Sequence, residues 1–147
     1  MGIKTTQADK WFSLCIRERA NWTCEYAGTI FTPPTNGLHC SHYKTRGNWS
    51  VRFEPLNAFA HSYGSHAYME ANKEDIFKPW IKEKLGDDYN ILLELAQCSD
   101  RAREYRKANK GRGKKNALIT HYKTEHERMQ ELRNDGHQGR IEFVGFI

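Results

Sequence analysis

Three polar residues near the middle of the chain, His42, Asn57 and His66, have types and a spacing that suit the hydrolysis of a phosphodiester. That reaction needs a base to deprotonate the attacking water, and a neutral imidazole with a pKa near the working pH suits this task. It also needs positive charge at the phosphate oxygens, which a bound divalent cation supplies. We therefore predict that His42 is the general base, that His66 is a metal ligand, and that the Asn57 amide ties down the loop carrying the base.

A hairpin followed by a helix would bring these side chains together. Residues 38–43 are predicted to form the first strand, with His42 near its end, and residues 50–53 the return strand. Residues 65–71 are predicted to form the helix that carries His66. The fold class expected is α+β, mostly helical, with this hairpin and helix as a ββα core.

Residues typical of helix ends indicate where the helices around this core begin and stop. Thr5 and Thr6 are candidate N-caps for a helix over about residues 7–19. A later helix, after Asn72, is predicted to stop at Gly86, with Pro79 bending it or marking a break near its first turn.

Longer runs of sequence point to a family. They are ADKWFSLCIRER (8–19), CEYAG (24–28), HYKTRG (42–47), RFEPLNA (52–58) and the closing His66. In this order and spacing they resemble the NinG/Rap family of lambdoid phages, over about residues 7–134. The resemblance implies an HNH-type, ββα-metal endonuclease that cuts branched recombination DNA such as Holliday junctions, D-loops and flaps. It also implies a role in bacteriophage recombination in the cytoplasm of an infected bacterial host.

The chain departs from the family pattern at its zinc knuckles. The family has two C-x-x-C pairs, and the corresponding positions here are Cys24, Ala27, Ser62 and Ser65. A tetrahedral zinc site needs four good ligands, so with only Cys24 left we expect no structural zinc. We expect an apolar plug in its place, made of Tyr26, Ala27, Phe59, Tyr63 and Ala67. The alternative is a rebuilt zinc site, made of Cys24, Cys40, His39 and His61.

A second departure concerns the catalytic metal. Many HNH sites have an Asp directly before the base, and this chain has Ser41. The cation would then be held by His66 with water and phosphate oxygens, with His39 and Ser41 as further candidate ligands. An imidazole ligand shifts preference from Mg²⁺ toward Mn²⁺, Ni²⁺ or Co²⁺. We expect an active enzyme that uses Mn²⁺ or Mg²⁺; the alternatives are a non-catalytic DNA-binding protein and a non-specific or RNA-directed nuclease.

Composition favours a polyanionic partner and no membrane. The chain has 147 residues, a net charge of +5 and a pI near 9.0, which suits DNA. It has no apolar run long enough to span a bilayer, and its four cysteines show no disulfide framework. The predicted DNA contacts are Lys44, Arg46, Arg52, Arg106, Lys107, Lys110, Arg112, Lys114 and Lys115.

The second part of the chain is expected to add affinity. We divide the chain into a nuclease domain, 1–98, and an appendage, 99–147. Residues 101–115 carry eight basic residues against one acid and are predicted to be a mobile basic arm on the phosphate backbone; a solvated linker is the alternative. A helix over 114–133 would either pack on the domain or pair with a second chain in a homodimer. The apolar tail, 140–147, is predicted to dock as a strand.

Overall fold

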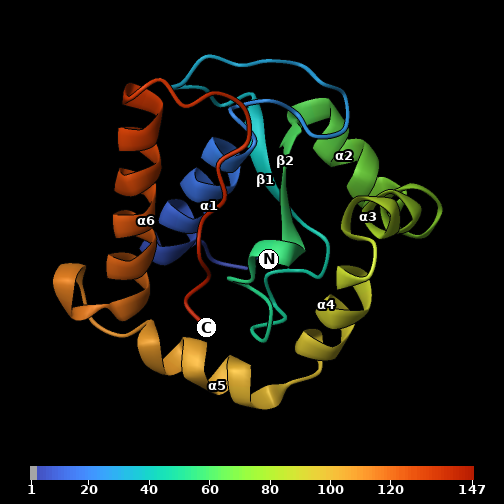
Figure 1. Cartoon of the computed structure of the whole chain (residues 1–147). Coiled ribbons are helices and arrows are strands. Elements are labelled where there is room, and N and C mark those ends of the chain that lie inside the picture. Colours follow the sequence, from blue (N-terminus) through green and yellow to red (C-terminus); the bar gives the residue numbers. More distant parts are fainter. Residues whose placement is uncertain (1–2) are drawn as a thin grey trace.

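A two-stranded antiparallel sheet lies at the centre of the molecule, with helices on both of its sides (Figure 1). The computed structural model describes residues 3–147. Its helices and strands are α1 (Gln7–Arg19), β1 (Leu38–His42), β2 (Ala58–Ser62), α2 (Tyr63–Ala71), α3 (Lys78–Leu85), α4 (Asp88–Ala96), α5 (Ser99–Ala108) and α6 (Ala117–Asn134). The fold is therefore α+β and mostly helical, as predicted. None of the helices within residues 3–147 has the length and apolar character needed to cross a bilayer.

The return strand is not where the sequence pattern placed it. Residues 50–53 form turns, and β1 pairs instead with β2, with His42 opposite Ala58 and Leu38 opposite Ser62. The prediction was wrong because Val51 and Phe53 are both fully buried in a loop that packs into the interior, and their apolar character imitates a strand. The AFAHS run of β2 has no β-branched residue and gives little strand signal.

Helix α1 begins where the sequence predicts. The Thr6 hydroxyl accepts a hydrogen bond from the Asp9 amide, and the Asp9 carboxylate accepts one from the Thr6 amide. This reciprocal capping box satisfies backbone donors that the first turn leaves without partners. Thr6, of the two candidate threonines, is therefore the N-cap.

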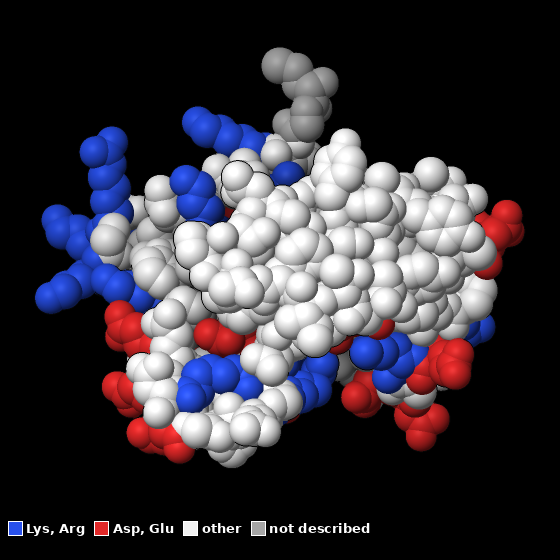
Figure 2. All heavy atoms as spheres, turned by 90° about the horizontal axis from the view of Figure 1, so that it is seen from above, with Lys and Arg blue, Asp and Glu red and all other residues white. Residues whose placement is uncertain are grey.

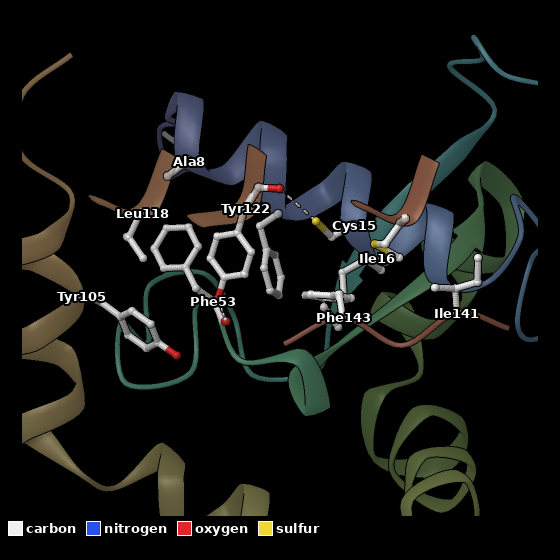
Figure 3. Packing of buried hydrophobic residues seen from close by; sticks show 12 residues of the cluster. Ala8, Cys15, Ile16, Phe53, Tyr105, Leu118, Tyr122, Ile141 and Phe143 are labelled. Atoms are coloured by element: carbon white, nitrogen blue, oxygen red, sulfur yellow. Dashed lines mark hydrogen bonds between the residues drawn. The ribbon is translucent and has the colours of Figure 1, made fainter. Parts of the chain in front are cut away.

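Helices α1 and α6 enclose the main core on one side of the sheet (Figures 1 and 3). Leu118, Tyr122 and Met129 of α6 are fully buried there, so the apolar stripe of α6 packs on its own domain, which is the first of the two predicted alternatives. Ile141 and Phe143 of the tail join the same core without forming a strand. The parts on either side of residue 98 thus share one core.

A second core cluster lies on the opposite side of the sheet, among the 43–57 loop, β2, and helices α2–α4. Helix α3 follows a short π-helical segment, Lys73–Phe77, has Pro79 in its first turn and ends at Gly86, which has a φ of +57°. Because the hairpin lies between two separate cores, both of its faces are covered. What remains accessible is the region beside β1.

Helix α5 replaces the first half of the predicted mobile arm. The Tyr105 side chain is fully buried, and Arg101 pairs with Glu54 at 2.8 Å (Nη2 to Oε1). These contacts dock α5 on the 43–57 loop. Only the segment between α5 and α6 remains as an exposed basic connection, and within it residues 113–115 form one 3-10 turn.

Candidate active site beside strand β1

A groove of about 820 Å³ runs beside β1, between α1 and α2. Its walls come from the N-terminal segment, α1, β1, the start of the 43–57 loop and α2. Three imidazoles line it, those of His39, His42 and His66. The structure therefore brings together the predicted base and the predicted metal ligand, together with His39.

The His42 imidazole is held in one tautomer by the loop behind it. Its Nε2 lies 3.1 Å from the carbonyl oxygen of Arg52, and a carbonyl can only accept. Nε2 therefore carries the proton and Nδ1 carries the lone pair. Burial lowers the pKa of His42 to about 4, although the Arg52 carbonyl acts in the other direction. At neutral pH the side chain is thus an uncharged acceptor of protons.

Asn57 clamps the loop that holds His42. The side chain is fully buried; its Oδ1 accepts from the Lys44 amide at 2.8 Å, and its Nδ2 donates to the carbonyls of Lys44 and Val51 at 2.9 and 3.1 Å. These bonds join the end of the loop, just before β2, to its beginning, just after β1, and to its middle. The predicted loop-clamping contacts of Asn57 are confirmed.

His39 and His66 form an imidazole pair at the groove. Their Nδ1 atoms lie 3.0 Å apart, and the two rings are nearly perpendicular. The Nε2 of His39 lies 3.1 Å from the Asn36 carbonyl oxygen, which requires a proton on Nε2 and leaves the lone pair on Nδ1. The Nδ1–H of His66 then donates to the Nδ1 of His39. Burial is the main cause that lowers the pKa of His66, and the nearby His39 lowers it further. The lower pKa favours the neutral, ligating form.

The imidazole pair also has the spacing of two ligands on one cation. With metal–nitrogen distances of about 2.1 Å, two nitrogens at a right angle on one ion lie about 3 Å apart. Among residues 3–147, however, no cluster of three or more His, Cys, Asp or Glu side chains is placed to hold a metal ion. The pair thus fits a cation that takes its other ligands from water or phosphate.

The predicted candidate ligand Ser41 does not line the groove, whereas Glu70, which was not predicted, does. The Ser41 hydroxyl is fully buried, has no hydrogen-bond partner among residues 3–147 and does not line the groove, so it is not a ligand there. Glu70 lines the groove one helical turn after His66 and has an exposed carboxylate 3.7 Å from Lys73. Glu70 is not among the predicted site residues, although its i+4 spacing from His66 on a predicted helix is a usable signal.

The arginines near His42 divide into structural and accessible ones. Arg52 is 2% exposed, and its guanidinium binds Asp9 through two bonds of 3.0 and 2.7 Å. The prediction that Arg52 contacts DNA was wrong, because Asp9 of α1 neutralises it inside the protein. Arg46 lines the groove and donates to Thr5 and to the Ile3 carbonyl. Lys44 is half-buried above the Tyr43 ring.

Cys24, Ala27, Ser62 and Ser65, the positions compared above with the zinc knuckles of the NinG/Rap family, lie together in space. Burial opposes ionisation of the Cys24 thiol, but hydrogen bonds from Ser65, Ala27 and Ser62 outweigh it and lower the pKa of Cys24 to about 7. The Ser62 and Ser65 hydroxyls lie 3.0 Å apart. Polar contacts to sulfur therefore take the place of the predicted apolar plug. That prediction was wrong, since Phe59 belongs to the core cluster beside α3 and Tyr63 is 71% exposed.

The rebuilt zinc site does not form either. Cys40 and His39 are neighbours on β1, so their side chains point to opposite faces of the sheet. His61 is fully buried among aromatic rings, and burial lowers its pKa to about 3. His61 is a core histidine.

The remaining basic residues lie on another part of the surface. Seen from above, Lys and Arg side chains project on the side where α6 lies, and uncharged residues form the middle of this face (Figure 2). The predicted DNA contacts of the second part of the chain are all exposed; they are Arg106, Lys107, Lys110, Arg112, Lys114 and Lys115. None of them lines the groove.

The comparison with known proteins found no relative, so a functional proposal has to rest on the geometry of the site. No protein-family model, no curated protein and no solved structure matches the chain.

Proposed function

We propose that the protein is a metal-dependent endonuclease that hydrolyses phosphodiesters in DNA, with branched recombination DNA of bacteriophages as its substrate. The observation that carries this proposal is the groove, in which an imidazole of fixed tautomer, His42, lies with the His39–His66 pair. The order of a strand ending in His42, an Asn57-clamped loop, a second strand and a helix with His66 supports a ββα-metal core. The branch preference rests on the resemblance to the NinG/Rap family.

His42 acts as the general base in this proposal. Its Nε2–H stays bonded to the Arg52 carbonyl, and its Nδ1 accepts a proton from the attacking water. Asn57 keeps the Arg52 segment in register with β1, so the imidazole does not need to reorient during the reaction. Arg46 and Lys10, which also line the groove, attract the phosphate.

His66 and His39 would hold the cation, and Glu70 is the nearest acidic side chain that lines the groove with them. When bound, a divalent cation supplies positive charge to the phosphate oxygens that gain negative charge. Two imidazoles favour Mn²⁺, Ni²⁺ or Co²⁺ over Mg²⁺. Ligation through both Nδ1 atoms would require the Nδ1 proton of His66 to move to its Nε2, and because a protonated imidazole cannot bind a cation, metal affinity should fall at acidic pH.

A non-catalytic DNA-binding protein is the second candidate. The buried Ser41 favours it, because the position next to the base then contributes no ligand to a cation. This candidate retains the basic surface and the groove but predicts no strand cleavage.

The deciding experiment measures cleavage of labelled four-way junction, flap, single-stranded and duplex DNA with Mn²⁺ and with Mg²⁺. We expect cleavage of branched DNA, faster in Mn²⁺. His42→Ala should reduce the rate by about 10²- to 10⁴-fold while DNA binding persists. His66→Ala should abolish cleavage and weaken Mn²⁺ binding measured by calorimetry. Binding of the junction without cleavage in any metal would favour the second candidate, and equal rates in the two metals would contradict imidazole ligation.

A further inference from the structure

A second, smaller cavity of about 340 Å³ continues the groove past α1. The two cavities have three lining residues in common, Leu14, Arg17 and Thr35. A chain molecule lying beside His42 and His66 can therefore extend into the second cavity by passing Arg17. Its volume lies within the range of sites that enclose one small ligand, about 300–1,000 Å³.

Arg17 lies at the junction of the two cavities as a half-buried cation that has no acidic partner among residues 3–147. The only hydrogen bond of its side chain within that range runs from Nε to the Ser13 carbonyl at 3.2 Å, and its guanidinium lies over the Trp22 ring, 5.0 Å from the centroid. Burial lowers the pKa of Arg17, but an arginine remains charged at neutral pH. The Nη atoms are thus free to bind an anion in the fork geometry that matches phosphate.

The two buried arginines of the described chain, Arg19 and Arg52, are bound differently from the half-buried Arg17. Arg52 is neutralised by Asp9, and Arg19 donates to the carbonyls of Pro55 and Ala58. Because burying an unpaired charge is costly, an arginine left without such partners at the mouth of a cavity points to a ligand that supplies them.

The second cavity has one polar side chain that the protein leaves unsatisfied. His126 of α6 lines the cavity and is 6% exposed; its Nε2 is buried without a partner, and neither ring nitrogen forms a hydrogen bond within the described part of the chain. Trp22, Pro33 and Pro34 form a flat apolar part of the wall, and Glu18 and Gln130 also line the cavity. The Trp22 indole is fixed by its bond to Glu18 at 3.1 Å. Flat apolar walls with an unpaired hydrogen-bonding group suit a planar heterocycle.

We propose that this second cavity, the Arg17–His126 pocket, receives one unstacked nucleotide of the DNA strand that lies in the groove. Arg17 binds the phosphate between the cleavage site and the pocket, the base lies against the Trp22 and proline walls, and the His126 imidazole hydrogen-bonds to its edge. The inference rests on the proposed nuclease function and gives it a physical basis for substrate choice. A nucleotide at a branch, bulge or flap is already unstacked, whereas a paired one must first be extracted from the duplex.

The test uses the full-length protein and DNA with 2-aminopurine at single positions, first without metal so that binding is separated from cleavage. We expect the fluorescence of 2-aminopurine to change at one position of a bulged duplex and at none of a fully paired one. Arg17→Gln should lower the affinity for bulged DNA about tenfold, as expected for one charge-assisted contact, and that for paired duplex no more than about twofold. His126→Phe keeps the ring and should remove the base-specific fluorescence change.

Arg103→Gln is the matched control, because it removes an arginine whose side chain is 71% exposed on α5. It should affect both DNA forms equally and by less than about twofold. The same substrates are then incubated with Mn²⁺. Position-specific fluorescence without cleavage would overturn the nuclease and keep the pocket. Cleavage without position-specific fluorescence, or an equal loss of both affinities in Arg17→Gln, would overturn the pocket and keep the nuclease. Failure to bind any DNA would overturn both.

Discussion

The groove beside β1 and the connection between α5 and α6 are both rich in basic or ionisable side chains, but they are built differently. In the groove, each imidazole is oriented by a hydrogen bond, and Asn57 and Arg52 behind it are fully buried. In the α5–α6 connection, Lys110, Arg112, Lys114 and Lys115 project from an exposed segment. Only the first arrangement fixes directions, so it suits chemistry, whereas the second suits affinity without orientation.

Removing the clamp should give the largest effect of the changes that test this contrast. Asn57→Ala leaves the amide and the carbonyl of Lys44 without these partners and leaves the Val51 carbonyl with the Glu54 amide alone. We expect a loss of about 2–4 kcal/mol in the free energy of unfolding and a fall in kcat of about 100-fold, because His42 loses its fixed orientation. Urea denaturation and single-turnover cleavage measure the two effects. An unchanged kcat in the folded variant would show that the clamp does not serve the base.

Neutralising the α5–α6 connection should have a smaller and different effect. Changing Lys110, Arg112, Lys114 and Lys115 together to Gln should lower DNA affinity about tenfold. The slope of log affinity against log salt concentration should become shallower by about 0.9 for each phosphate that these side chains neutralise in the wild type. The rate at saturating DNA should stay the same. Fluorescence anisotropy over a range of salt concentrations measures the affinity. A fall in the rate at saturation would mean that these residues act on the reacting strand.

The smallest expected effect is that of moderate acid on the chemical step. Burial holds the pKa of His42 near 4, so the neutral base persists at pH 5, and single-turnover cleavage at saturating Mn²⁺ should fall less than about twofold between pH 7 and 5. A base with the ordinary pKa of about 6.5 would lose about 25-fold over the same range. A loss of that size would show that His42 titrates normally and is not shielded.

The free energy of unfolding should also decrease when His42 becomes protonated. Because the folded pKa of His42 lies below the unfolded one, the unfolded chain binds more protons between about pH 6.5 and 4, and stability falls as the pH falls through that range. Circular dichroism at each pH therefore accompanies the rate measurements, so that unfolding is not mistaken for loss of the base.

Features that depend on neighbouring residues could be predicted from the sequence alone. The threonines before Gln7 predict the start of α1, Gly86 predicts the end of α3, and the spacing of His42, Asn57 and His66 predicts their approach to one another. Each of these depends on backbone capping or on one short connection, and the residue types carry that information directly.

Tertiary contacts set which polar groups are neutralised internally and which are left for a ligand. Arg52 and Arg17 are both arginines near the predicted site, yet Asp9, 43 residues away in sequence, removes the first from the surface, while no carboxylate within residues 3–147 pairs with the second. Ser41 and His39 lie on the same face of β1, yet packing buries Ser41 completely, whereas His39 reaches His66 at the groove. Such outcomes depend on long-range pairing between elements, and residue spacing along the chain does not encode them.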